Sequence, residues 1–279
     1  MASRIVSFFR SKAENKSKLK IQAAAKAADI LPFVPADGLD YEKFFRTIHK
    51  KFLFDWYMEI GCRTGEIFAQ ARGKTIAIDP YFLVTTNAIG LKPALYTFQS
   101  TSDEFFASKF LDKNNILIAL SFLDGMHLLE YLLSDFINTE RYSRPDGVIV
   151  MHDCCPYNMA MTTRDLDNLP EGAWTGDVWK LLPILQQYRP DLKITVLNCA
   201  TTGLVLVSSL APNNETLKIN YDAIIKTYRD LDLEAFGIEA FYSSFNYTDA
   251  QAYLDAGAPE FAKVAQDASH VLKPVFVSP

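Results

Sequence analysis

The 279-residue sequence lacks several features that would assign it to a well-defined class of protein. Its formal net charge is −5, whereas wholesale binding of nucleic acid needs a basic face, so nucleic acid is not expected as a partner. No stretch approaches the roughly 18 uncharged apolar residues of a membrane-spanning helix. The four cysteines form no CxxC pair, which argues against a zinc site and favours reduced thiols.

The N-terminus also lacks the long apolar run and the cleavage site of a secretory signal, because Arg4 and Arg10 flank only a short apolar patch. We therefore expect a cytoplasmic protein. Residues 1–40 are expected to form a helical arm, with a basic helix over residues 11–29. Two interpretations of this arm stay open: a solvated segment, or peripheral contact with an anionic membrane surface.

After residue 40, short apolar runs alternate with longer amphipathic segments. Runs that are apolar on both faces predict a parallel sheet covered by helices on both sides. Two later runs flank a turn ending in Gly203, which predicts a C-terminal antiparallel hairpin. The expected strands span residues 56–60, 75–78, 94–98, 116–123, 147–151, 193–198 and 204–208.

The expected fold class is therefore α/β, a Rossmann-like and mostly parallel seven-stranded sheet with helices on both faces. We expect this domain over residues 41–210 and a helical extension over residues 211–279. Pro183 is expected to kink or restart one helix. The expected helices of the domain and extension span residues 64–72, 128–139, 177–188, 221–231 and 250–254.

The first strand ends in a glycine-rich turn that contains Glu59, Gly61 and Gly65. Glycines at this spacing allow the backbone to approach a ligand closely, and a helix that follows would point its N-terminus at the same place. The turn lacks the third glycine of pyrophosphate-binding dinucleotide folds. This favours a nucleoside ligand without a pyrophosphate.

Asp79 ends the second strand, 18 residues after Gly61. An acidic residue at about this distance can accept hydrogen bonds from ribose hydroxyls. The alternative is a turn or helix-capping acid beside Pro80. With the glycine-rich turn upstream, we favour the ribose role.

These residues resemble the class I S-adenosylmethionine-dependent methyltransferases. The resemblance implies that Glu59, Gly61 and Gly65 wrap the methionine part of the cofactor and that Asp79 binds its ribose. It places residues 100–103, with Thr101 and Ser102, near the adenine. It covers about residues 50–210.

Two further stretches resemble a subgroup of small-molecule and sugar O-methyltransferases: Phe122–His127, which contains Asp124, and Arg144–Asp153. Asp146 stands where that subgroup usually has the first glycine of a Pro-Gly-Gly turn. Residues 174–180 also resemble the subgroup. We expect Asp177 and Lys180 on the acceptor side and Trp179 in the core, and we count Asp124 among the cofactor-binding residues.

Asp124 and Asp153 end neighbouring strands, and two convergent carboxylates can share a hard divalent cation such as magnesium. The resemblance implies a third oxygen ligand beside Asp153, but His152 and Cys154 stand there. A thiol is a poor magnesium ligand, while histidine favours a transition metal. Alternatively catalysis needs no metal, and His152 or His127 takes the proton of the acceptor hydroxyl.

The sequence thus predicts a methyltransferase that uses S-adenosylmethionine, with His152, Asp153 and His127 as candidate catalytic residues. The expected reaction is O-methylation of a small polyhydroxylated or glycan acceptor. Two alternatives remain: a non-catalytic binding protein that uses the same pocket, and a nicotinamide-dependent oxidoreductase. A homo-oligomer is left open.

Overall fold

The computed structural model describes residues 33–266. The predicted basic helix over residues 11–29 lies outside the described residues. Among the described helices, none is long and apolar enough to cross a membrane.

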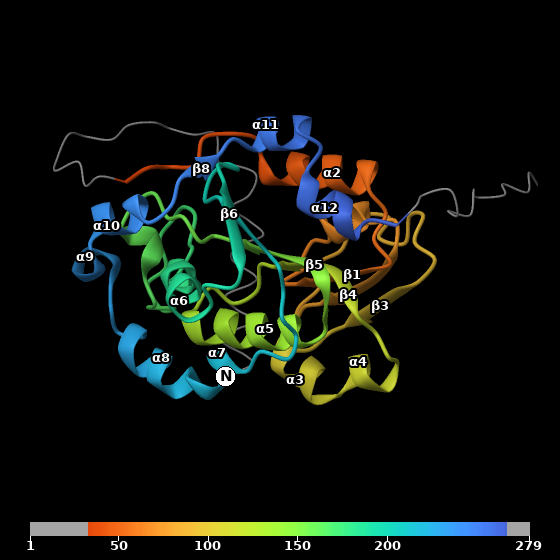
Figure 1. The fold of residues 1–279 in the computed structure, drawn as a ribbon, viewed down its shortest axis with the longest axis horizontal. Helices are drawn as coiled ribbons and strands as arrows, with labels where there is room; N and C mark the ends of the chain where they lie inside the picture. Colours follow the sequence, from red (N-terminus) through yellow and green to blue (C-terminus); the bar gives the residue numbers. More distant parts are fainter. Residues whose placement is uncertain (1–32, 267–279) are drawn as a thin grey trace, which may run out of the picture.

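One mixed sheet organises the described chain (Figure 1). Its strand order is β3-β2-β1-β4-β5-β7-β6-β8. The first five strands in this order, from β3 at the edge to β5, pair in parallel. β7 runs antiparallel to both β5 and β6, so the predicted terminal hairpin is confirmed. The strands are β1 (Trp56–Ile60), β2 (Lys74–Ile78), β3 (Leu95–Phe98), β4 (Ile118–Leu123), β5 (Ser143–His152), β6 (Lys193–Leu197), β7 (Leu204–Ser208) and β8 (Tyr247–Thr248).

All seven predicted strands are present, and the α/β class is confirmed. The expected number of seven was one too low, because the two-residue strand β8 adds to the edge at β6. A strand this short leaves no readable alternation of apolar and polar residues.

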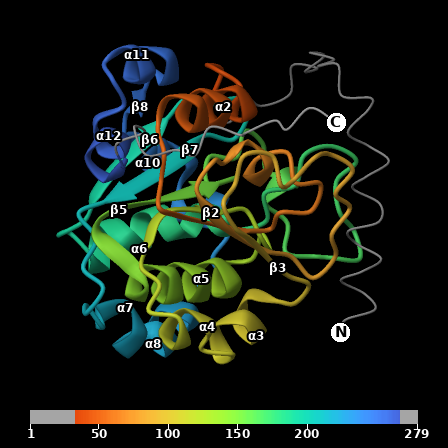
Figure 2. The ribbon, with the colours of Figure 1, turned by 90° about the vertical axis from the view of Figure 1, so that its right-hand side faces the viewer.

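Helices cover both faces of the sheet, as Figure 2 shows. One core lies between the sheet and α5, α6, α8 and α10, and the other lies beneath α2, α11 and α12. All six residues of β4 are buried, as expected for a central strand between two helical layers. The helices are α2 (Tyr41–Lys51), α3 (Ser102–Ala107), α4 (Phe110–Lys113), α5 (Leu129–Arg141), α6 (Leu181–Tyr188), α7 (Thr216–Ile219), α8 (Tyr221–Tyr228), α9 (Leu233–Phe236), α10 (Ile238–Ser243), α11 (Ala250–Asp255) and α12 (Pro259–Val264), with 3₁₀ turns η1 (Phe68–Gln70), η2 (Ala160–Thr162) and η3 (Val178–Lys180).

The helix predicted over residues 64–72 is wrong, since only the single turn η1 forms there. Gly65 has φ +81°, which a right-handed helix cannot contain, and Ala71 is already extended. Instead of a following helical turn, Leu83 donates its backbone N–H to the Arg63 carbonyl at 2.7 Å. The segment after β2 therefore folds onto the glycine-rich turn.

Pro183 restarts the helix predicted over residues 177–188. The 3₁₀ turn η3 comes first, and α6 then begins at Leu181. Pro183 thus lies in the first turn of α6, where a backbone N–H has no partner within the helix.

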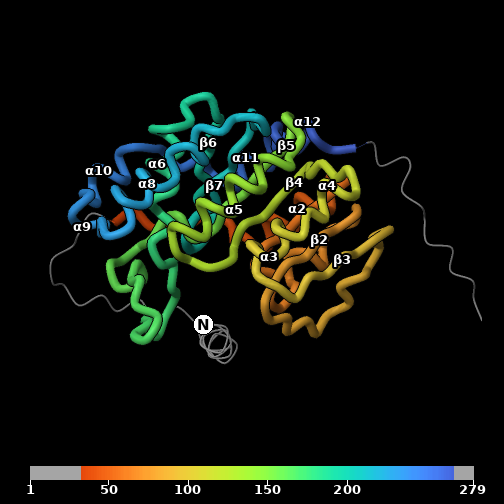
Figure 3. Tube along the Cα trace, turned by 90° about the horizontal axis from the view of Figure 1, so that it is seen from below, coloured from red at the N-terminus to blue at the C-terminus, as the bar shows by residue number. Residues whose placement is uncertain are grey.

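The C-terminal segment joins the main fold through several contacts. β8 pairs with β6, α12 packs near β5, and α11 packs near α2. Figure 3 shows β2 and β3 toward one end of the molecule and α8 to α10 toward the other. The expected helical pieces in this segment are confirmed as α8 and α11, while the domain boundaries at residues 40 and 210 stay predictions.

Candidate functional site

Four side chains meet where β4 and β5 end, as the sequence predicts for adjacent parallel strands. We call Asp124, His127, His152 and Asp153 the Asp–His cluster. His152 Nδ1 lies 3.2 Å from Asp124 Oδ1 and 3.5 Å from Asp153 Oδ1. His127 lies between the same carboxylates, 3.4 Å from Asp124 through Nε2 and 3.2 Å from Asp153 through Nδ1. The cluster alternates acids and imidazoles.

The histidines determine how Asp124 ionises. Burial opposes the charged carboxylate, but the hydrogen bonds of His152 and His127, and their positive charges when they are protonated, outweigh it and hold the pKa of Asp124 below its ordinary value. Asp124 is therefore a carboxylate at neutral pH. It can act as a hydrogen-bond acceptor or as a cation ligand.

Two residues that the sequence reasoning missed complete the cluster. Thr202 donates its hydroxyl to Asp153 Oδ1 at 2.7 Å, and the Thr202 Oγ1 atom lies 3.4 Å from His152 Nε2. The Tyr41 ring packs against His152 with ring centroids 4.2 Å apart. Thr202 belongs to the predicted hairpin turn, but only the pairing of Leu204 with His152 carries that turn to the end of β5.

His127 is held in place by the segment before η3. Its Nδ1 lies 2.8 Å from the Trp174 carbonyl oxygen, and the two rings stack with centroids 5.1 Å apart. Gly176 lies directly against the His127 backbone: a Cβ there would meet the His127 carbonyl oxygen at 1.6 Å. Only glycine allows this approach.

Asp177 and Lys180 have structural partners, and their expected place on the acceptor side stays a prediction. Asp177 accepts the Leu129 N–H at 2.8 Å, at the start of α5, and forms ion pairs with Arg164 and Lys180 at 2.5 and 2.7 Å. Lys180 also donates to the Arg229 carbonyl. Both side chains are buried. The expected burial of Trp179 in the core is confirmed.

The glycines of the turn after β1 were expected to allow close approach of a ligand, but the structure shows a packing role for Gly61. Gly61 has φ +89°, and a Cβ on it would lie 2.0 Å from the Asp124 carbonyl oxygen. Gly65 also has positive φ. Gly61 is therefore required for the contact between the turn and the end of β4. The direct role of both glycines in ligand binding stays a prediction.

Asp79 fixes the glycine-rich turn to the segment after β2. Its carboxylate accepts the Arg63 N–H at 2.8 Å and the Tyr81 N–H at 2.6 Å, and only 1% of the residue is exposed. These hydrogen bonds agree with the alternative interpretation from the sequence, in which Asp79 is a turn acid beside Pro80. A carboxylate has about four acceptor positions, so two remain for other donors. The ribose role stays a prediction.

Glu59 faces the protein interior from β1. It accepts the Tyr57 hydroxyl at 2.6 Å and is 2% exposed. Burial raises the pKa of Glu59 to about 8, and the charges of Asp124 and Asp79 act in the same direction. Three carboxyl groups at the ends of β1, β2 and β4 therefore influence one another.

Thr101 and Ser102 begin α3. The Thr101 hydroxyl accepts the Glu104 N–H, and Glu104 accepts the Thr101 N–H in return, which makes a complete capping box. Their adenine-binding role stays a prediction beside this structural one.

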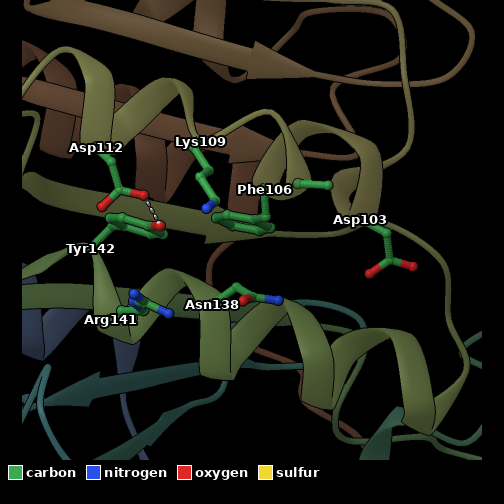
Figure 4. Close-up of a pocket in the computed structure, with 8 residues that line it drawn as sticks. Asp103, Phe106, Lys109, Asp112, Asn138, Arg141 and Tyr142 are labelled. Atoms are coloured by element: carbon green, nitrogen blue, oxygen red, sulfur yellow. Dashed lines mark hydrogen bonds between the residues drawn. The ribbon is translucent and has the colours of Figure 1, made fainter.

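A cavity of about 680 Å³ lies elsewhere, between α3, α4 and α5 (Figure 4). The Phe106 and Tyr142 rings are nearly parallel there, with centroids 6.2 Å apart, and Tyr142 donates its hydroxyl to Asp112. Asp103, from the stretch 100–103 that the sequence places near the adenine, lines this cavity, and no residue of the Asp–His cluster does. The cavity is separate from the Asp–His cluster.

The donor set at the cluster differs from an all-oxygen magnesium site. Asp124, His152 and Asp153 each offer one ligand atom, and these three atoms lie within 4.8 Å of one another. Cys154 is buried, and its sulfur lies 3.4 Å from the His152 carbonyl oxygen. Burial raises the pKa of the Cys154 thiol and so opposes its thiolate form.

No protein-family model and no curated protein sequence match the chain. Several solved structures are similar to it in fold. A cofactor-bound protein from MTB is 12% identical, with 76% of this chain and 91% of that chain covered and a TM-score of 0.49. An O-methyltransferase from Bacillus cereus in complex with SAH is 14% identical, with 74% and 90% covered and a TM-score of 0.47. The O-methyltransferase TomG from Streptomyces achromogenes in complex with SAM is 15% identical, with 75% and 90% covered and a TM-score of 0.46.

We predict that Glu59→Gln becomes increasingly more stable than the unchanged protein as the pH rises from 4.5 to about 8. The raised pKa of Glu59 favours the folded state while the carboxyl is protonated. This contribution is complete below 4.5, the ordinary pKa, and is lost as the pH rises through about 8. Glutamine stays neutral and can still accept the Tyr57 hydroxyl.

Urea denaturation at pH 5, 6.5 and 8 measures the free energy of unfolding of both proteins. The difference between them should be at most about 1.4 kcal/mol for each unit by which the pKa of Glu59 is raised. Glu239→Gln, at an exposed position of α10, is the matched control and should show no such trend. A stability difference that does not change with pH would contradict the buried, protonated state of Glu59.

Proposed function

We propose that this chain is an S-adenosylmethionine-dependent methyltransferase that transfers the methyl group to a hydroxyl of a small polyhydroxylated or glycan acceptor. The observation that carries the proposal is the contact between the glycine-rich turn and Asp124. It puts the cofactor-binding candidates beside the Asp–His cluster, at the edge of a parallel sheet where ligands bind.

The charge at this edge favours a cationic cofactor. Burial raises the pKa values of Glu59 and Asp79, and the charge of Asp124 adds to both shifts, so a positive group there would stabilise the charged form of these carboxyl groups. S-adenosylmethionine carries a sulfonium and an ammonium group. A nicotinamide dinucleotide would bring a negatively charged pyrophosphate to the same place, so the oxidoreductase alternative is disfavoured.

S-adenosylmethionine supplies an already reactive methyl group, so the protein has two tasks. It must align the acceptor oxygen with the methyl carbon, and it must remove the proton of the acceptor hydroxyl. The Asp–His cluster offers groups for the second task. Tyr41 and Thr202 hold His152 from two sides and limit its rotation.

In a metal-free mechanism, His152 is the base. Its Nδ1 faces Asp124 and Asp153, so the favourable tautomer carries the proton on Nδ1 and donates it to these carboxylates. The basic nitrogen is then Nε2, near Thr202. Because Thr202 donates its hydroxyl to Asp153, it does not consume the lone pair of Nε2.

In a metal-assisted mechanism, Asp124, Asp153 and His152 Nδ1 would hold a divalent cation. The cation would bind the acceptor hydroxyl and lower its pKa. Two oxygens and one imidazole nitrogen suit manganese or another transition metal better than magnesium. The two mechanisms exclude each other, because one nitrogen cannot both donate a proton and ligate a metal.

A second candidate function is a non-catalytic binding protein with the same fold. It is favoured by one observation: Asp79 and Glu59 are buried and already have hydrogen-bond partners in the protein. In this case the cofactor-binding residues would serve only the fold. Cofactor titration separates the two candidates.

We predict that calorimetric titration detects binding of S-adenosylmethionine and that Asp79→Asn weakens it at least about tenfold, about 1.4 kcal/mol. Asparagine keeps the shape of the side chain but removes the charge and acceptor capacity that two ribose hydroxyls need. Asp230→Asn, at an exposed position, should bind like the unchanged protein.

Transfer of a labelled methyl group to a panel of sugars and polyols then tests catalysis. His152→Asn should lower kcat at least about 100-fold while cofactor affinity stays the same, which is the size expected for a lost general base or a lost ligand of the reacting group. Cofactor binding without transfer to any acceptor would support the non-catalytic candidate. The absence of binding would contradict the proposed cofactor.

We predict that Mn²⁺ binds to the protein more tightly than Mg²⁺, measured by titration calorimetry without cofactor or acceptor. Asp153→Asn should abolish manganese binding, since it removes one of the two carboxylate ligands. Glu239→Gln should leave it unchanged. If neither cation binds, the metal-free mechanism is the one that remains.

A further inference from the structure

The connection between β2 and β3 is long and has no regular secondary structure. It runs from residue 79 to residue 94 without a helix or strand, and it loops out at the end of the molecule that carries these two strands (Figure 3). Connections longer than about 12–15 residues without secondary structure are uncommon in compact domains, and many of them are lids or binding loops. We call residues 80–93 the strap.

The first half of the strap lies on the glycine-rich turn. Leu83 donates its backbone N–H to the Arg63 carbonyl at 2.7 Å. Val84 lies against Gly65, where a Cβ would be 3.2 Å from the Val84 side chain, and Gly65 is buried. The strap therefore covers the part of the turn that the sequence predicts to lie close to the cofactor.

The second half of the strap is attached by a lysine. Of residues 80–93, all of which the structure describes, only Lys92 is buried, and its Nζ donates to the Ala69 carbonyl at 3.0 Å. Ile89 and Leu91, by contrast, are 58% and 54% exposed. The charged side chain thus lies inside and the apolar side chains outside, which is the reverse of the usual distribution.

This distribution gives the strap little local stability. Its apolar side chains are half-buried or exposed, whereas residues 75–78 of β2 are all buried. A segment with few buried apolar contacts opens at a much smaller cost in free energy than the core strands do. The strap can therefore open while β2 stays paired, and the contacts of Leu83, Val84 and Lys92 oppose this opening.

The closed strap also lies on the acid that the proposed function assigns to the ribose. Asp79 is 1% exposed, and its carboxylate accepts the N–H of Tyr81, within the strap, at 2.6 Å. A ligand that contacts both Asp79 and the glycine-rich turn has to enter where the strap lies. Entry of such a ligand requires the strap to lift.

We propose that the strap is a gate that opens as one unit to admit the cofactor, with Leu83 and Lys92 as its two points of attachment. This proposal rests on the proposed function, since the ligand that the gate admits is S-adenosylmethionine. If only the open form binds, the apparent dissociation constant exceeds that of the open form by the inverse of the open fraction. Weakening an attachment should therefore tighten cofactor binding, whereas the loss of a merely structural contact would not.

Hydrogen exchange of the full chain without cofactor, measured by mass spectrometry, tests whether the strap opens as one unit. Lys92→Met removes the donor to Ala69 and keeps a long side chain. It should raise the exchange rate of the hydrogen-bonded amides within residues 81–86, at the opposite end of the strap, at least about tenfold, because a single opening exposes both ends. Acceleration confined to residues 87–93 would overturn the opening as one unit.

The exchange experiment has two controls. Thr86→Ala changes an exposed side chain of the strap and should leave the exchange rates as they are in the unchanged protein. The amides of β2 should exchange equally slowly in every variant, which shows that each variant remains folded.

Titration calorimetry with S-adenosylmethionine tests the gate. Lys92→Met and Val84→Ala should each tighten cofactor binding at least about threefold, and Thr86→Ala should bind like the unchanged protein. Val84→Ala changes no charge, so it separates the loss of an attachment from the loss of the positive charge of Lys92.

The outcomes separate the gate from the proposed function. If S-adenosylmethionine binds to the unchanged protein but Val84→Ala binds it equally well or more weakly, the gate is overturned and the proposed function stands. If S-adenosylmethionine does not bind to the unchanged protein, the proposed function fails and the gating role fails with it. Hydrogen exchange still decides in that case whether the strap opens as one unit.

Discussion

The parallel pairing of β4 with β5 is the constraint on which the candidate site depends. Leu123 pairs with Met151, so the next residues, Asp124 and His152, emerge side by side at the edge of the sheet. A change of register by one residue would move every side chain of the strand to the opposite face of the sheet. Burial of β4 on both faces makes such a change costly, because every residue of the strand except Ser121 contributes to one of the two cores.

The position of His127 in the Asp–His cluster depends on a buried network of ion pairs and not on the pairing of strands. Asp177 joins the N-terminus of α5 to Arg164 and Lys180, and the neighbouring Gly176 and Trp174 then contact His127. Removing one partner would leave a buried charge, which commonly costs about 3–5 kcal/mol. The network therefore fixes His127, whose carbonyl also accepts the backbone N–H of Asp177 at 3.2 Å.

Much of the fold could be predicted from the sequence, because it follows from local patterns. β1 and β7 are apolar runs with the predicted bounds, and the two carboxylates converge because parallel strands end at one edge. The helix over residues 64–72 could not be excluded locally, since Gly65 lies against Val84, from the segment after β2: a Cβ on Gly65 would lie 3.2 Å from the Val84 side chain.

The missed site residues share one cause. Thr202 contacts Asp153 from 49 residues away, and Tyr41 precedes β1 altogether. Neither has a sequence spacing that relates it to the cluster, because only the antiparallel return of β7 and the packing of α2 bring them there. Site residues that directly follow a strand, such as Asp124 and Asp153, could be predicted from the sequence. Site residues that reach the cluster through tertiary packing, such as Tyr41 and Thr202, could not.

The hydrogen bonds of Asp79 place a physical condition on cofactor binding. Its carboxylate joins the glycine-rich turn to the segment after β2 through the N–H groups of Arg63 and Tyr81, and Leu83 adds a bond to the Arg63 carbonyl. If Asp79 has the proposed ribose role, the ribose hydroxyls would either use its remaining lone pairs or replace these donors. Because Asp79 is buried, either route requires the segment after β2 to move away from the turn. Cofactor affinity would then include the cost of breaking the Leu83 contact, and the order of this segment would report on occupancy of the site.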